Sequence, residues 1–163
     1  MHLRDELKIN RPLAPGHELA LGILLTREYV GRLFEKALFE GAGITDQQFN
    51  VLRILKGGPA EGYLIRDLRT RMIYRFADVP RLVNRLAAQG LVARCENPAD
   101  RRGSRIRITS EGLALEARIH NAHDQLCAEV AEGLSEADRA ALLALLERLR
   151  NGLRDRLKSI EKD

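Results

Sequence analysis

Residues 82–112 of this 163-residue chain read LVNRLAAQGLVARCENPADRRGSRIRITSEG, and this stretch decides the fold. It opens inside an amphipathic helix that we expect over about 78–89, and Gly90 is placed to end that helix. Residues 91–95 are short, apolar and strand-like. After a turn-rich, arginine-rich tip, residues 105–109 alternate charged and β-branched side chains. The stretch therefore predicts a helix that leads directly into a β-hairpin with one buried face.

The helix expected over 78–89 has two chemically different faces. One side carries apolar residues at helical spacing, namely Val79, Leu82, Val83 and Leu86. The other side carries Arg81, Asn84, Arg85 and Ala88. We expect the first face to join a core and the second to make polar contacts.

The rest of the chain is predicted to be helical, apart from an extended N-terminal arm through Pro15. Thr45 and Gln48 form a capping box, and Ser135 is an N-cap. The last helix carries a leucine stripe that requires a partner helix, with ordinary intramolecular core as the alternative. We expect helices over about 17–40, 46–56 and 64–72, then from 110 to about 132, and from Ser135 onward. The sequence predicts one domain over 1–163, mainly α with a small β-hairpin wing.

Charge is distributed unevenly along the chain. The net charge is +4, but residues 66–107 hold eleven Arg and no Lys against four acidic residues, which gives this stretch +7. A basic middle is typical of a surface that faces a polyanion, although a solvated basic face is the alternative. The sequence has neither a signal core nor an apolar run of about 18 residues, so we expect a cytoplasmic protein without a membrane partner.

Catalytic and metal-binding patterns are weak. Cys95 and Cys127 fit a reducing compartment and have no metal-ligand spacing. His120 and His123 lie three residues apart near Glu116 and Asp124, and we interpret all four as solvated helix residues. The sequence lacks a phosphate loop, a nucleophile elbow and a zinc-protease motif. We therefore predict a protein that is not an enzyme and has no metal or cofactor.

The two short helices and the hairpin are the parts of a winged helix-turn-helix. The sequence resembles the MarR family of bacterial regulators, loosely over residues 17–155. It departs from the family where many members carry Ser or Thr, because Phe76 and Pro80 stand there, and this leaves the start of the recognition helix open by two or three positions. The resemblance rests on RLVNRL (81–86), Gly-Leu-Val (90–92), Asn-Pro (97–98), Asp-Arg-Arg (100–102) and Ile-Thr-x-x-Gly (108–112).

The resemblance implies a homodimer that represses transcription at a pseudo-palindromic site on double-stranded DNA. Residues 45–109 would form the DNA-binding lobe, and residues 1–42 and 110–163 the long N- and C-terminal dimerisation helices. Asp100 would orient Arg102 toward a minor groove, unless the pair only closes the hairpin. Each candidate residue on the recognition helix could contact a base edge or only a backbone phosphate, and both alternatives stay open. The candidate DNA-binding residues are Arg75, Arg81, Asn84, Arg85, Asp100, Arg101, Arg102 and Arg105.

The resemblance also implies a small aromatic or anionic effector in a crevice beside the dimerisation helices. Tyr29, Phe49 and Arg53 are our candidates for lining it, with ordinary core packing as the alternative. Redox-sensing relatives use a Cys near the start of the first helix, where this chain has none, so a thiol switch is less favoured. The competing function is a winged-helix protein-interaction module that does not bind DNA, and the eleven Arg residues argue against it.

Overall fold

The computed structural model describes residues 2–96 and 104–161, which form two compact units, Met1–His123 and Asp124–Asp163. The wing-tip candidates Asp100, Arg101 and Arg102 lie outside the described residues. The predicted division into lobe and dimerisation helices stays a prediction. The elements are α1 (Leu3–Glu6), α2 (Pro15–Phe34), a π-helix η1 (Glu35–Phe39), α3 (Asp46–Lys56), β1 (Tyr63–Leu64), α4 (Ile65–Arg71), α5 (Val79–Ala88), β2 (Val92–Glu96), β3 (Ser104–Ile108), α6 (Ser110–Val130) and α7 (Glu136–Ile160).

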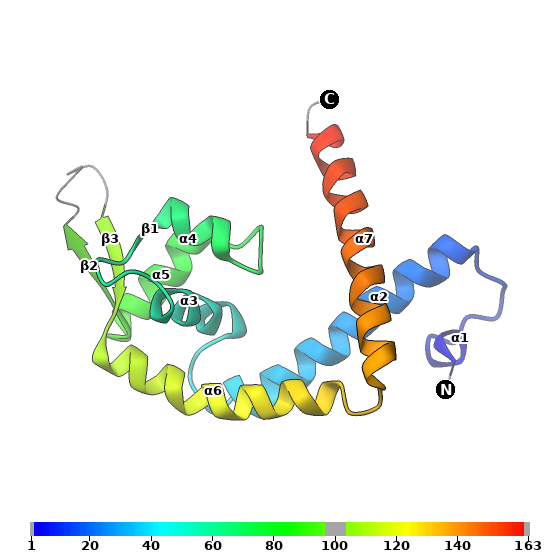
Figure 1. Ribbon diagram of the computed structural model, residues 1–163, viewed down its shortest axis with the longest axis horizontal. Helices are drawn as coiled ribbons and strands as arrows, with labels where there is room; N and C mark the ends of the chain where they lie inside the picture. Colours follow the sequence, from blue (N-terminus) through cyan, green and yellow to red (C-terminus); the bar gives the residue numbers. More distant parts are fainter. Residues whose placement is uncertain (1, 97–103, 162–163) are drawn as a thin grey trace. The chain divides into compact units, whose positions relative to one another are not determined.

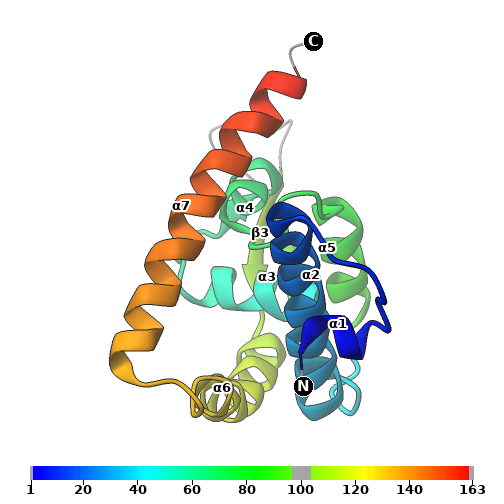
Figure 2. The ribbon, with the colours of Figure 1, turned by 90° about the vertical axis from the view of Figure 1, so that its right-hand side faces the viewer.

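The fold class is confirmed as mainly α with a small antiparallel sheet. The helices α3, α4 and α5 pack with one another and with the strands (Figures 1 and 2). Their fully buried side chains form one core, which includes Val51, Leu52, Leu68, Met72, Val79, Val83, Leu86 and Ile106. This is the winged helix-turn-helix arrangement that the sequence predicted.

The N-terminal region differs from the prediction. The arm is not wholly extended, because residues 3–6 form α1 and the Tyr29 hydroxyl of α2 donates a hydrogen bond to Glu6. The long first helix also changes character, because α2 gives way to the wider π-helix η1. Within this π-helix Leu38 and Phe39 are buried.

The sheet has three strands and not the two of the predicted hairpin, in the order β1-β3-β2. The hairpin pairs Val92 with Ile108 across β2 and β3, and the additional strand pairs Tyr63 with Ile106. Gly62 makes this third strand possible, because its φ of +80° favours glycine and a Cβ there would overlap the Ile106 carbonyl oxygen. A two-residue strand carries no periodic signal, so the sequence did not reveal it.

Both predicted helix caps are present. The Gln48 backbone N–H donates to Thr45 Oγ1 (3.3 Å), and the Thr45 backbone N–H donates to Gln48 Oε1 (2.8 Å). The same reciprocal pair joins Ser135 and Asp138 at the start of α7. Hydrogen bonds from the Ser135 hydroxyl and backbone N–H lower the pKa of the Asp138 carboxyl.

A tight junction fixes the end of the wing against the exit of α5. Thr109 Oγ1 donates to the Gly90 carbonyl oxygen (2.7 Å) and accepts from the Gly112 N–H (3.0 Å). The Thr109 N–H donates to the Leu91 carbonyl oxygen (3.2 Å). A Cβ at Gly112 would overlap that same carbonyl oxygen. The Thr-x-x-Gly pattern thus joins α5, β3 and α6 at one point.

Replacement of Gly112 by alanine should destabilise the protein, because the added methyl group has no space beside the Leu91 carbonyl. We expect the free energy of unfolding to fall by about 2 kcal/mol, measured by urea denaturation. Gly16→Ala is the matched control, since nothing lies within 4 Å of a Cβ there. Equal stability of Gly112→Ala and the wild type would show that the junction is not closely packed.

Glu116 is a correction to the sequence analysis, which placed it among solvated residues. Its side chain is only 2% exposed. Lys56 Nζ of α3 lies 2.5 Å from Glu116 Oε2, and His120 Nδ1 lies 3.6 Å from Oε1. A carboxylate buried in this way requires partners, because its desolvation is otherwise uncompensated. The ion pair therefore ties α6 to α3.

Lys56→Met should leave Glu116 buried without its closest cation. We expect a loss of about 2 kcal/mol in the free energy of unfolding, less than for a fully buried pair because Lys56 is 41% exposed. The double variant Lys56→Met with Glu116→Leu should recover most of that loss. Lys158→Met, which removes an exposed pair with Asp155, is the control and should change stability little. A neutral Lys56→Met would contradict the role assigned to the pair.

Candidate nucleic-acid interface and adjoining cavity

The predicted recognition helix is α5, and its start is now defined. Asp78 is the N-cap, with Oδ1 accepting from the Arg81 backbone N–H at 3.2 Å. Pro80 lies in the first turn, where a missing N–H costs nothing. Gly90 follows the helix with a φ of +72°. These features place Arg81 in the first turn of α5, where its side chain can contact a partner that binds at the N-terminal end of this helix.

The polar face of α5 is exposed as predicted. Its apolar face is buried against α3, α4 and β2, while Arg81, Asn84 and Arg85 are exposed. Asn84 Oδ1 accepts a hydrogen bond from Arg94 Nη2 of β2 at 2.7 Å. Arg94 was not among the candidates from the sequence, although its exposed position in β2 beside the helix exit was a usable signal. This bond fixes Asn84 and joins the wing to the outer face of α5.

Two predicted arginines have intramolecular hydrogen bonds. Arg75 Nη1 donates to the Thr70 carbonyl oxygen at 2.6 Å, which holds this side chain against the end of α4. Arg105 is partly buried, and its Nη1 donates to the Gly62 carbonyl oxygen at 2.8 Å. Arg105 therefore supports the contact between β3 and the turn before β1.

Two hydrogen bonds hold the turn between α4 and α5, one within the turn and one to α3. The Ala77 N–H donates to the Tyr74 carbonyl oxygen at 3.1 Å, which closes the turn. The Ile73 N–H donates to Oδ1 of the buried Asn50 of α3 at 3.0 Å. Asn50 was missed by the sequence analysis, because its role depends on a segment 23 residues away.

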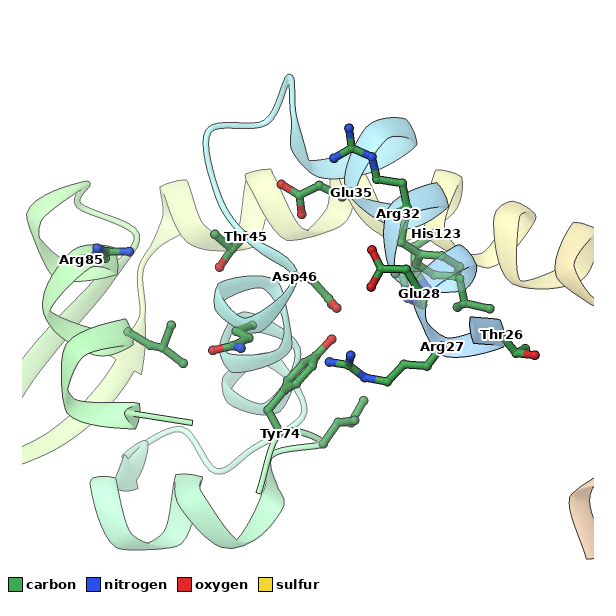
Figure 3. A pocket seen from close by; sticks show the side chains of 16 residues that line it. Thr26, Arg27, Glu28, Arg32, Glu35, Thr45, Asp46, Tyr74, Arg85 and His123 are labelled. Carbon is green, nitrogen blue, oxygen red and sulfur yellow. The ribbon is translucent and has the colours of Figure 1, made fainter. Parts of the chain in front are cut away.

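A cavity of about 840 Å³ lies within the unit Met1–His123. Its walls come from α2 and η1, the start of α3, the turn after α4, and the α5 residues Leu82 and Arg85, with His123 of α6. Figure 3 shows Tyr74 and Arg27 approaching one another, with Asp46 pointing toward the same region and Arg85 at the far end. The cavity therefore reaches both the first long helix and the recognition helix.

The lining of the cavity combines side chains of both charge signs with aromatic side chains. Three arginines and three acidic residues line it: Arg27, Arg32, Arg85, Glu28, Glu35 and Asp46. The His123 ring packs edge-on to Phe34, with ring centroids 5.3 Å apart, and lies 5.5 Å from Phe49. Burial raises the pKa of the Asp46 carboxyl, the nearby His123 opposes this rise, and Glu35 adds to it. A small aromatic molecule with polar groups suits this lining.

The three residues expected in an effector crevice lie elsewhere in the described structure. Tyr29 is 58% exposed on α2, Phe49 is fully buried in the core, and Arg53 is exposed on α3. None of the three is among the residues that line this cavity. The lining residues come from separate segments and share no spacing, so the sequence had no pattern from which to choose them.

Within residues 2–96 and 104–161, no group of three His, Cys, Asp or Glu side chains is placed to hold a metal ion. Among the described helices, none is long and apolar enough to cross a membrane. Cys95 is a free thiol.

Comparison with known proteins identifies the relatives of this chain. A sequence model of the MarR family matches residues 42–103. A putative transcriptional regulatory protein for the hcr operon of Thauera aromatica is 29% identical over 131 residues, which are 79% of this chain and 78% of that protein.

Solved structures agree with this relationship. Bordetella bronchiseptica BpsR, described for regulation of its DNA binding by 6-hydroxynicotinic acid, is 28% identical with a TM-score of 0.67, over 80% of this chain and 98% of that one. A mutant of E. coli MarR in complex with operator DNA is 26% identical with a TM-score of 0.71, over 80% and 92%. These relatives are regulators and not enzymes. In sequence over residues 42–103 and in its fold, this chain resembles the MarR family of winged helix-turn-helix transcriptional regulators.

Proposed function

We propose that this protein is a homodimeric repressor that binds a pseudo-palindromic operator in double-stranded DNA and is released by a small-molecule effector. The observation that carries the proposal is the exposed stripe of Arg81, Asn84 and Arg85 along a helix whose other face is buried. A helix of this kind fits the major groove, where Arg and Asn recognise base edges bidentately. We also propose a cytoplasmic location, because a bacterial regulator that binds DNA works there.

The charge around α5 supports DNA as the partner. Arg94 touches Asn84 from the wing, and residues 66–107 carry a net charge of +7. The relative in complex with operator DNA has the same fold. A protein-interaction module would instead present an uncharged recognition face, so this alternative function is less favoured. We propose that Asp100, Arg101 and Arg102 extend the DNA contacts from the wing tip.

A second copy of the chain is proposed as the partner of the exposed apolar residues on the long helices. No residue of α2 or α7, both of which are fully described, is buried. These two helices expose Leu19, Leu24, Val30, Leu33, Leu142, Leu143, Leu145, Leu153, Leu157 and Ile160. Covering them in a two-fold dimer would place two α5 helices on DNA about 34 Å apart, as successive major grooves require.

The cavity is the proposed effector site. It is lined by Leu82 and Arg85, and Arg85 also belongs to the exposed stripe of α5. A bound ligand would therefore act directly on the recognition helix and shift the spacing of the two helices in the dimer. BpsR, whose DNA binding is regulated by 6-hydroxynicotinic acid, makes an aromatic acid a reasonable first choice of ligand. Tyr29, Phe49 and Arg53, which the sequence suggested for an effector site, do not line this cavity, and their role stays a prediction.

Arg81→Ala should weaken binding to the DNA upstream of the protein's own gene by about 1–3 kcal/mol, because α5 loses a charge at its leading end. Fluorescence anisotropy titrations at several salt concentrations measure this loss. If Arg81 reads a base, the variant should lose part of the preference for the upstream fragment over random DNA. If Arg81 contacts only a phosphate, affinity for both DNAs should fall equally, and the slope of log affinity against log salt concentration should be smaller by about one.

Arg118→Ala is the matched control, because Arg118 is an exposed arginine on α6, away from the recognition helix. It should leave affinity and salt slope nearly unchanged. If the wild type neither prefers the upstream fragment nor loses affinity steeply with salt, the operator-binding proposal is wrong.

A ligand of the cavity should raise the melting temperature of the protein, because it binds the native state; at one hundred times its dissociation constant the gain is about 2.7 kcal/mol. A thermal-shift screen of phenolic and heteroaromatic acids measures this response. Arg27→Ala should reduce the shift, since Arg27 lines the cavity, whereas the control Arg118→Ala, at an arginine that does not line it, should retain the shift. An equal shift in Arg27→Ala and the wild type would place the ligand elsewhere.

A further inference from the structure

Phe76 has the largest exposed fraction among the described large hydrophobic residues, at 84%. It lies in the turn closed by the bond between Tyr74 and Ala77. Turns of this kind usually carry Gly, Asn, Asp, Ser or Pro, so an aromatic residue is unusual at this position. Leaving a Phe side chain in water forgoes the favourable free energy of its burial. The position of Phe76 therefore requires an explanation.

The core contacts on either side of this turn are made by the neighbours of Phe76 and not by its ring. Met72 and Val79, on either side of the turn, are fully buried. The Asn50 side chain holds the Ile73 backbone, and Asp78 caps α5 two residues after Phe76. The turn is thus fixed at both ends while the aromatic ring stays outside. The backbone that carries the ring is therefore already ordered and loses little freedom when a partner covers the ring.

The surroundings of Phe76 indicate what covers it. Arg75 precedes it in the turn, and Arg81 follows in the first turn of α5, both exposed. A ring flanked by two arginines favours a partner that is negatively charged and also offers an apolar group. Duplex DNA satisfies both features, because its phosphates attract arginine and its major groove presents one apolar group, the C5-methyl of thymine.

We propose that Phe76 is a specificity-determining residue that contacts thymine C5-methyl groups in the major groove next to the leading end of α5. The proposal rests on the DNA-binding function proposed above and adds a base preference to it. A single thymine contact of this type buries about one methyl-sized group. The corresponding gain in affinity is about fourfold per thymine.

Uracil-substituted DNA tests this contact directly, because uracil differs from thymine only by the absent methyl group. The fragment upstream of the protein's own gene is prepared once with thymine and once with uracil throughout. Dissociation constants on both are then measured for the wild type, Phe76→Ala and Phe76→Leu. The ratio of the two constants for one protein cancels any difference in its folded fraction.

The wild type should bind thymine DNA at least about fourfold more tightly than uracil DNA. Phe76→Ala should lose most of that preference, and Phe76→Leu should keep a large part of it because leucine is still apolar. Leu113→Ala is the control, since Leu113 is an exposed aliphatic residue (42%) of α6 that belongs neither to this turn nor to the cavity lining, and it should keep the wild-type ratio.

Two results would overturn the inference. One is a wild-type ratio near one. The other is an unchanged ratio in Phe76→Ala, and if affinity for both DNAs falls equally in that variant, the ring contacts the sugar. If Phe76→Ala alters the dimer mass and not the ratio, the ring packs on a second copy instead. If the wild type does not prefer the fragment over random DNA, the proposed function itself is wrong. This outcome differs from one in which the wild type prefers the fragment but the thymine preference does not depend on Phe76.

Discussion

The burial of one face of α5 is the constraint on which the rest of the structure depends. Val79, Leu82, Val83 and Leu86 pack against α3, α4 and the sheet, and this fixes the rotation of the helix about its axis. Because residues three and four apart share a face, the same rotation places Arg81, Asn84 and Arg85 outside together. The hydrophobic effect thus positions the charged face, and the charged residues themselves contribute little to the fold.

Polar bonds between distant segments then refine this arrangement. Asn50 holds the turn before α5, Arg94 holds Asn84, and Thr109 ties the exit of α5 to the start of α6. Each bond joins an element of the proposed DNA-binding face to a neighbour. The cavity lies against the same helix through Leu82 and Arg85, so the proposed ligand site and the proposed DNA-binding face share α5.

Local patterns in the sequence predicted the parts of the fold that depend on local physics. The amphipathic α5, the capping boxes at Thr45 and Ser135, and the two strands of the wing follow from spacing and side-chain type. The strand β1 was missed because two residues show no period. The Lys56–Glu116 pair joins residues 60 apart, and the cavity lining comes from many segments, so neither leaves a local signal. The sequence showed Phe76 as a departure from the family, but only the structure shows that Met72 and Val79 are buried while the Phe76 side chain is exposed.

Footprinting of the wild-type protein on the DNA upstream of its own gene tests the central claim most directly. Attack by hydroxyl radicals and methylation of guanine N7 report on the backbone and the major groove respectively. If two α5 helices enter successive major grooves, two symmetric protected regions should lie about 34 Å apart, with guanine N7 shielded in each. Uniform cleavage, or backbone protection with every guanine N7 still reactive, would contradict the account.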